Sequence, residues 1–275
     1  MKHPNNDYTL IQIYNEAINL FLFNIDLSLD MEEDHIHKLR VNIKNLRAII
    51  ILVKTIKEKE FKKKKVSALI SQIFKPTGEL RNIQIEQLLL EHYDSKAIQI
   101  YKDHLTKIEE QTGINAKKTL LEFNKSDFQI KNEKAKYIIE EINDKELSSG
   151  LKKLIRKEFE KITQIRTKLY DDKALHEIRK HLKVLKSILK IQLVINQDNT
   201  TESLLNQINA TETLIGNWHD KELLLESITQ FIENNINDPK SNLLENIVRK
   251  IKIENKNAPE KINFNLNEIF SSNNL

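Results

Sequence analysis

The chain has 275 residues, of which only 4 are Gly, 4 are Pro and none is Cys, while 6% are aromatic and 31% are charged. So few turn-forming residues argue against an all-β sandwich and against a glycine-rich nucleotide-binding fold. The lack of cysteine excludes a disulfide scaffold, a thiolate metal site and a cysteine nucleophile. The 44 Lys and Arg nearly balance the 40 Asp and Glu, and the net charge is +4.

Apolar residues recur at three- and four-residue steps along almost the whole chain, beginning with the stretch from Tyr8 to Leu29. No segment alternates with period two, so the pattern predicts an all-α chain. The expected helices cover residues 8–29, 32–57, 62–74, 79–93, 95–124, 128–143, 147–170, 173–195, 200–214, 218–236 and 240–254.

Polar and glycine-containing segments are expected to interrupt these helices. They include Pro76-Thr77-Gly78, Thr112-Gly113, Ser148-Ser149-Gly150 and Gly216-Asn217. Residues 256–275 are rich in Asn and predict a polar C-terminal tail, docked through Ile262, Phe264, Leu266 and Phe270.

The start of the sequence and its apolar runs indicate the cellular location of the protein. The first seven residues show no charged region followed by an apolar stretch, so no signal peptide is expected. The longest apolar run, from Ala48 to Val53, is far shorter than the roughly 20 residues of a membrane-spanning helix. We therefore expect a soluble, cytoplasmic protein without a membrane partner.

An internal repeat is the most informative feature of the sequence. Residues 36–49 and 175–188 share the pattern apolar-His-x-apolar-Arg-x-x-apolar-Lys-x-Leu-[Arg/Lys]-x-Ile. A second repeated motif, which begins with glycine, follows each copy of the first. Gly78 lies 41 residues after His37, and Gly216 lies 40 residues after His176. The repeat predicts a single domain over residues 1–255, made of two helical halves at about 8–145 and 146–238 that are related by a pseudo-two-fold axis.

Each copy of the repeat places basic side chains on one face of a helix, beside its apolar stripe. The two ridges consist of His37, Arg40, Lys44 and Arg47 in the first half and His176, Arg179, Lys183, Lys186 and Lys190 in the second. Residues 35–57 and 178–197 contain six and five Lys or Arg and no acid. An ordinary solvated face normally mixes both signs, so the pattern favours an anionic ligand. His37 and His176 lead the ridges as N–H donors or as packed helix residues.

Gly78 and Gly216 are expected to end one helix and to open the next. Arg81 and His219 would then lie in first turns, where free N–H groups favour anions. Asn82 and Asp220 are expected to orient the basic side chains from behind.

The His219-Asp220 pair allows a second interpretation. Metal-dependent phosphohydrolases of the HD class are all-α and use a His-Asp dipeptide, so His176, His181 and Asp220 could gather around a metal ion. Against this, the repeat partner of the dipeptide is Arg81-Asn82, and no Walker loop, nucleophile elbow or His-Glu-x-x-His motif is present.

The four motifs, in this order over roughly residues 8–240, resemble the CHAD domain, the conserved histidine α-helical domain. The resemblance implies two four-helix bundles about a pseudo-two-fold axis, enclosing a basic groove or pore that binds inorganic polyphosphate. It implies ligands at His37, Arg40, Lys44, Arg47 and Arg81 and at His176, Arg179, Lys183 and Lys186, which Lys190 extends by a turn. Asn82 stands where the family has an acid, and Lys186 where an Arg is common. The Glu-x-Glu-x-Lys signature of the CYTH triphosphatase domain that some members carry is absent.

We therefore expect a non-catalytic polyphosphate-binding module without a metal or cofactor, acting in the cytoplasm with polyphosphate granules or polyphosphate-metabolising proteins. The ridges carry no aromatic stacking platform, so nucleic acid is not the expected ligand. The alternatives are an HD-like phosphohydrolase and a scaffold that binds RNA or an acidic protein.

Overall fold

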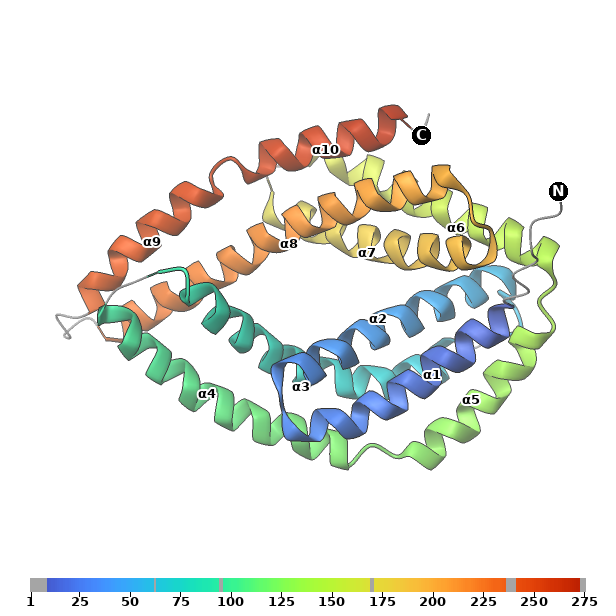
Figure 1. The fold of residues 1–275 in the computed structure, drawn as a ribbon, viewed down its shortest axis with the longest axis horizontal. Helices are drawn as coiled ribbons and strands as arrows, with labels where there is room; N and C mark the ends of the chain where they lie inside the picture. The colour runs from blue at the N-terminus through green and yellow to red at the C-terminus, as the bar shows by residue number, and fades with distance from the viewer. Residues whose placement is uncertain (1–8, 62, 94–95, 169–170, 236–240, 273–275) are drawn as a thin grey trace.

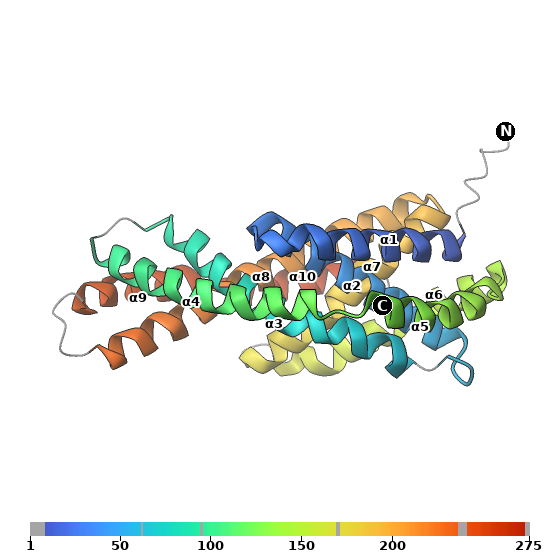
Figure 2. The same ribbon diagram turned by 90° about the horizontal axis from the view of Figure 1, so that it is seen from below.

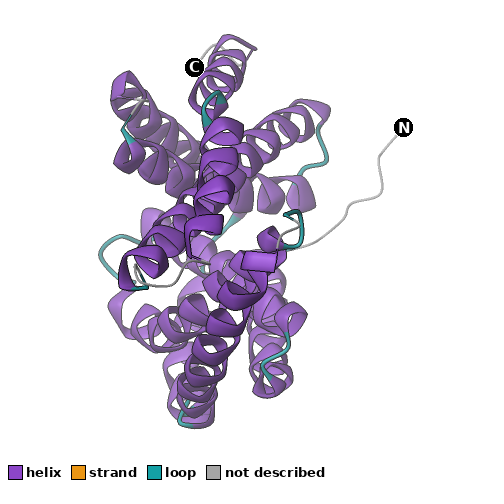
Figure 3. Cartoon of the chain, turned by 90° about the vertical axis from the view of Figure 1, so that its left-hand side faces the viewer, coloured by secondary structure: helices purple, strands orange, loops and turns teal. Residues whose placement is uncertain are grey.

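The computed structural model describes residues 9–61, 63–93, 96–168, 171–235 and 241–272, and all regular structure within them is helical (Figure 3). This confirms the all-α prediction. The helices are α1 (Leu10–Leu27), η1 (Ser28–Asp30), α2 (Glu33–Ile56), α3 (Lys63–Leu90), α4 (Lys96–Leu121), α5 (Lys125–Glu140), α6 (Asp144–Ile165), η2 (Arg166–Lys168), α7 (Asp172–Ile195), α8 (Asn199–Asn234), α9 (Ser241–Asn255) and α10 (Ala258–Ser272).

The helices form an elongated, flattened body (Figure 1, Figure 2). The two copies of the basic motif lie on α2 and α7, and the two glycine motifs lie on α3 and α8. In the middle of the body α2 contacts α7, and α3 contacts α8 (Figure 1). The repeated segments are therefore neighbours in space, although about 139 residues separate them in sequence.

Three large apolar cores and a small cluster of Ile36, Leu80 and Ala116 hold the described helices together. One core joins α1, α2, α5 and α6 with the first half of α3, and a second joins α6, α7 and α10 with the first half of α8. The third joins α4 and α9 with the C-terminal parts of α3 and α8. Each of the two longest helices thus takes part in two cores, which requires both helices to continue without a break.

Side-chain caps determine where several of the helices begin. Asn143 accepts a hydrogen bond from the Glu146 backbone N–H, and the Glu146 side chain accepts one from the Asn143 backbone, which forms a capping box. This is why α6 starts at Asp144, three residues before the predicted helix. At α7 and α8 the cap is simpler, because the side chains of Asp171 and Asp198 accept hydrogen bonds from the backbone N–H groups of Lys173 and Thr201.

The predicted breaks at Pro76-Thr77-Gly78 and Gly216-Asn217 are wrong, because α3 and α8 run through them. The predicted breaks at Thr112-Gly113 and Ser148-Ser149-Gly150 are also wrong, since they lie inside α4 and α6. A proline inside a helix removes one backbone hydrogen bond, here the one to the Gln72 carbonyl. Two side chains donate to the two carbonyls that follow in the same turn. The Thr77 hydroxyl donates to the Ile73 carbonyl at 2.8 Å, and Arg40 donates to the Phe74 carbonyl at 2.7 Å.

The predicted polar tail is largely helix α10, and residues 273–275 lie outside the described part of the chain. Ile262, Leu266 and Phe270 dock it against the second core, as expected, whereas Phe264 is 64% exposed. The many Asn residues concealed a helix because its apolar stripe occupies only one face. Within the described residues, none of these helices has an apolar stretch long enough to cross a bilayer.

Gly150 and Gly113 offer a matched test of this packing, since both are buried inside helices. A Cβ at position 150 would lie 2.3 Å from Ile56 Cγ1, so we expect Gly150→Ala to lower the free energy of unfolding by about 1–3 kcal/mol. At position 113 the nearest atom, Met31 Cγ, is 3.8 Å away, so Gly113→Ala should add about 0.5–1 kcal/mol through helix propensity. Urea unfolding measures both; equal effects of the two substitutions would contradict this account of the α2–α6 contact.

Candidate functional site

The two basic ridges meet because α2 and α7 lie side by side. The apolar residues that precede the basic ones, among them Ile36, Leu39, Leu175 and Ile178, are at most 1% exposed. Ser187 on α7 donates a hydrogen bond to Asn45 on α2 at 3.3 Å, which joins the two helices directly. Each ridge therefore lies along the edge of a buried stripe and faces neighbouring helices.

Arg40 crosses from α2 to the backbone of α3. Its Nη1 donates to the Phe74 carbonyl at 2.7 Å, and it lies 2.6 Å from the position that a Cβ on Gly78 would occupy. Only glycine leaves room for the guanidinium at this position.

Arg179 repeats this arrangement against α8 in the second half. Its Nη2 lies 2.9 Å from the position of a Cβ on Gly216. The prediction that Gly78 and Gly216 end or open helices is wrong, because both lie in helix interiors and provide space for an arginine. For the same reason Arg81 and His219 lie in mid-helix, without the free N–H groups of a first turn.

Phe74 organises the arginines of the first half. The guanidinium carbons of Arg40 and Arg47 lie 4.3 and 4.0 Å from the centre of its ring, within the range of a cation–π interaction. Arg47 also donates to the Ser71 hydroxyl at 3.1 Å. The two cations are thus positioned by an uncharged side chain.

Glu212 occupies the corresponding place in the second half, and the sequence prediction did not include it. Its carboxylate lies 3.4 Å from Arg179 Nε, 3.9 Å from Lys183 Nζ and 3.3 Å from Lys186 Nζ. Burial alone would raise the pKa of Glu212, but Lys183, Lys186 and Arg179 hold it below its usual range. Its position four residues before Gly216, where Phe74 precedes Gly78, was the available signal.

The cations of the two halves act on one another. Burial is the main cause that lowers the pKa of Lys44 to about 8, with Arg40, Arg179 and Lys186 adding to it and Glu212 opposing them. Burial also lowers the pKa of Lys183 to about 7, together with Arg179 and Lys44. Burial and the neighbouring arginines lower the pKa of Arg40 to about 10, so it stays charged at neutral pH.

We call this group the central basic cluster. It comprises Arg40, Lys44, Arg47, Arg81, Arg179, Lys183 and Lys186. Its members come from three helices of both halves, and the carboxylates close to it are those of Glu212, Asp220 and Glu33 among the described residues. Such a concentration of buried positive charge is favourable for an anion.

Arg81 links the cluster to the start of α2. Its side chain is 14% exposed, its Nη1 lies 2.7 Å from Glu33 Oε1, and its buried Nε has no hydrogen-bond partner. Partial desolvation of the His37 ring is the main cause that lowers its pKa, and the positive charge of Arg81 lowers it too. His37 is therefore a neutral imidazole, and it lies exposed at the edge of the cluster. Asn82 is exposed, and no hydrogen bond joins it to the basic side chains within the described part.

His176 and His219 form a pair in the second half, with ring centres 5.1 Å apart. They line a pocket of about 530 Å³ between α7 and α8, next to Trp218. Burial is the main cause that lowers the pKa of both, that of His219 to about 4, with Arg179 and Lys183 adding to it. At neutral pH both rings are therefore uncharged N–H donors.

The geometry does not gather the residues of the HD-like alternative. His181 points away from the cluster and its Nδ1 lies 2.6 Å from Glu158 Oε2. Asp220 faces Arg179, with 3.8 Å between Oδ1 and Nη1. Among the described residues, no group of three or more His, Cys, Asp or Glu side chains is arranged to hold a metal ion.

Lys190 does not join the central basic cluster. It is exposed and lines a groove of about 170 Å³ between α1, α2 and α7, whose walls include Ile13, Leu20 and Ile191.

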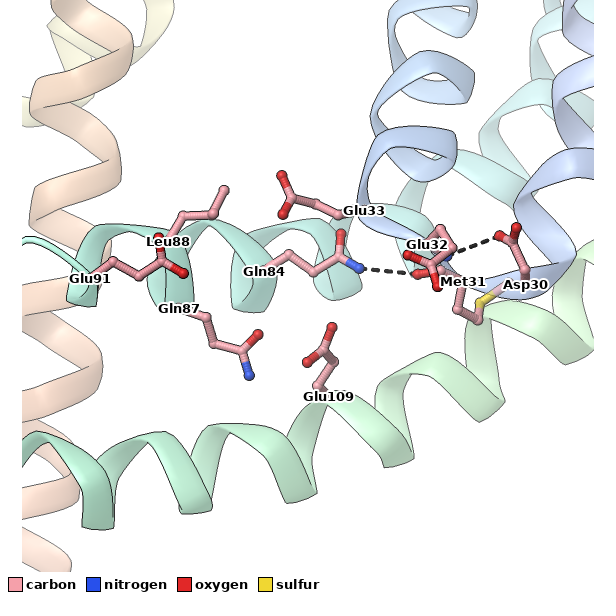
Figure 4. Close-up of a pocket in the computed structure, with 9 residues that line it drawn as sticks. All are labelled: Asp30, Met31, Glu32, Glu33, Gln84, Gln87, Leu88, Glu91 and Glu109. Carbon is pink, nitrogen blue, oxygen red and sulfur yellow. Dashed lines mark hydrogen bonds between the residues drawn. The ribbon is translucent and has the colours of Figure 1, made fainter.

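An acidic pocket of about 280 Å³ borders the cluster where α2 begins (Figure 4). Its walls carry Asp30, Glu32, Glu33, Glu91 and Glu109, and Glu33 is the residue that contacts Arg81. These carboxylates repel an anion. This pocket is therefore unfavourable for a polyanion.

Comparisons with known proteins agree with the fold. The family model of the CHAD domain matches residues 13–229, so the chain belongs to the CHAD domain family. The crystal structure of the CHAD domain from the plant Ricinus communis superposes with a TM-score of 0.72 at 12% identity, covering 97% of this chain and 94% of that chain. At this identity the likeness concerns the fold alone. No curated protein sequence matches.

The low pKa of Lys183 predicts how stability depends on pH. Between its folded value of about 7 and the unfolded value of about 10.4, the unfolded chain binds more protons, so the free energy of unfolding rises with pH in this window. We expect Lys183→Met to reduce that rise by up to about 1.4 kcal/mol per pH unit. Urea unfolding at pH 7, 8 and 9 measures it, with the exposed Lys190→Met as the control that keeps the wild-type slope. Parallel curves for wild type and Lys183→Met would show that Lys183 is not desolvated.

Proposed function

We propose that this chain binds inorganic polyphosphate at the central basic cluster, without catalysing a reaction on it. The observation that carries the proposal is the pair Lys44 and Lys183, one from each half, whose burial beside arginines lowers the pKa of both. Buried like charges destabilise a folded protein unless a counter-charge is supplied. A bound polyanion supplies that charge, and both halves contribute contacts to it.

The form of the cluster favours a ligand recognised by charge density. Arginine forks and lysine ammonium groups suit the non-bridging oxygens of phosphate. The aromatic ring within the cluster, Phe74, is already stacked by Arg40 and Arg47, and Trp218 is only 5% exposed. Neither is available to stack on a base, so RNA is not the proposed ligand.

The contacts of His181 and Asp220 support a non-catalytic role. His181 is bonded to Glu158 and Asp220 faces Arg179, so neither supports a metal-dependent hydrolysis. We propose a role in the cytoplasm with polyphosphate granules or polyphosphate-metabolising proteins as partners.

A titration with long-chain polyphosphate tests the proposal. If about seven phosphates are neutralised, the log–log dependence of affinity on salt should have a slope of roughly −5, at about −0.7 per phosphate. We expect Lys44→Met and Lys183→Met each to weaken binding about tenfold, which corresponds to the loss of one charge-assisted contact. The matched control is the pair Lys152→Met and Lys153→Met, exposed lysines on α6 that should leave affinity nearly unchanged.

Two further measurements in the same assay address the alternatives. RNA should compete poorly, and comparable affinity for RNA would favour a nucleic-acid ligand. Phosphate release with added Mn²⁺ or Mg²⁺, lost in Asp220→Ala, would show an enzyme. A salt slope near zero would overturn the electrostatic basis of the proposal.

Gly216→Ala separates the site from the fold. The added Cβ displaces the end of the flexible Arg179 side chain, while alanine favours the helix interior by up to about 1 kcal/mol. We expect unchanged or higher stability in urea and about fivefold weaker polyphosphate binding, because Arg179 loses its position. Gly113→Ala, also in a helix interior, is the control for binding. If affinity is retained in Gly216→Ala, Arg179 is not a ligand in the placement described.

A further inference from the structure

Two corresponding positions of the duplicated chain hold side chains of opposite character. Phe74 precedes Gly78 by four residues on α3, and Glu212 precedes Gly216 by four residues on α8. Both lie where the ridge of the preceding helix meets its neighbour. The first half therefore places its basic residues around an aromatic ring, and the second half places the corresponding basic residues around a carboxylate.

In the first half, Arg40 and Arg47 form no ion pair with a carboxylate among the described residues. Arg40 and Arg47 stack on Phe74, and their hydrogen bonds go to the neutral Phe74 carbonyl and the Ser71 hydroxyl. A ring orients a guanidinium without neutralising it. The outer parts of these two arginines thus remain suited to an anion.

In the second half the cations are already engaged. Glu212 has a side chain only 13% exposed and lies within 4 Å of the cationic nitrogens of Arg179, Lys183 and Lys186. One carboxylate meets three cations there, as a phosphate group of a ligand would. The charge of Glu212 also raises the pKa of Lys44 in the first half, so the carboxylate acts on cations of both ridges.

We propose that Glu212 is a built-in competitor of the ligand, an internal anion that occupies the second-half cations when the site is empty and weakens polyanion binding there. This inference rests on the proposed function. The ligand then binds first to Arg40 and Arg47, and it has to share or displace Glu212 to reach Arg179, Lys183 and Lys186. The carboxylate lowers the repulsion among three partly buried cations in the free protein, and it also limits the affinity for the ligand.

Glu212→Gln tests this, because it removes the charge and keeps the shape. We expect it to bind long-chain polyphosphate about tenfold more tightly at low salt, since one repulsive charge a few ångströms from the ligand is removed. Without ligand, the melting temperature should fall by roughly 5 °C, because the cations lose their partner. Glu233→Gln, an exposed position near the end of the same helix, changes the net charge equally and should alter neither value.

A double-mutant cycle with Lys186→Ala makes the test specific. In the wild type Lys186 is partly neutralised by Glu212, so its loss should weaken binding only about threefold, and about tenfold in the Glu212→Gln background. Arg47→Ala, at the corresponding place in the first half, should weaken binding equally in both backgrounds.

The outcomes separate the two proposals. If the wild type binds polyphosphate while Glu212→Gln binds equally or more weakly, Glu212 positions the cations and this inference is overturned alone. If neither the wild type nor Glu212→Gln binds polyphosphate, the proposed function fails, and this inference fails with it. Tighter binding by Glu212→Gln but not by Glu233→Gln supports both.

Discussion

The arrangement of the charged site depends on the contact between an arginine and the backbone of the next helix, which occurs once in each half. Arg40 lies against Gly78 and Arg179 lies against Gly216, so close that a methyl group would collide with each guanidinium. The contact carries positive charge from α2 and α7 into the space beside α3 and α8. Both α3 and α8 pass these glycines without a break, and each of the two helices takes part in two of the apolar cores.

Charge burial follows from this geometry. Side chains that reach inwards from both ridges lose water and approach one another, so the charged forms of Lys44 and Lys183 become less favourable. In the first half few carboxylates lie near these cations, whereas in the second half Glu212 lies among them and offsets part of their charge. A fold that keeps cations at such a cost in stability is consistent with a site whose counter-charge arrives with the ligand.

The duplication reproduced the backbone geometry more closely than the chemistry. The arginine and glycine of each half meet in the same manner, yet Phe74 and Glu212 differ, as do Arg47 and Lys186, Arg81 and His219, and Asn82 and Asp220. A cation–π contact and an ion pair can each hold a guanidinium in place. Because either interaction satisfies the same geometry, the two halves were free to diverge in charge.

Periodicity and the repeat were sufficient to predict the helical class, the buried stripes of α2 and α7 and the residues of the two ridges, because both depend on short-range spacing along one helix. Where helices end was less predictable. Gly78 and Gly216 have the composition of breaks, but packing on both sides of α3 and α8 outweighs the roughly 1 kcal/mol that glycine costs in a helix. In the turn before Pro76, the side chains of Thr77 and Arg40 donate hydrogen bonds to the Ile73 and Phe74 carbonyls.

The sequence by itself determined that the chain is all-α, that it is duplicated and that it carries two acid-free basic ridges. The tertiary structure alone decided which charges lie close together. It brings the two ridges together, places Glu212 among the cations of the second half, and keeps Lys190 and His181 outside the cluster. It also packs α10 on the second core. The reason is physical, since the energy of a charge depends on its distance from other charges and from water, and both are set by contacts between helices far apart in the chain.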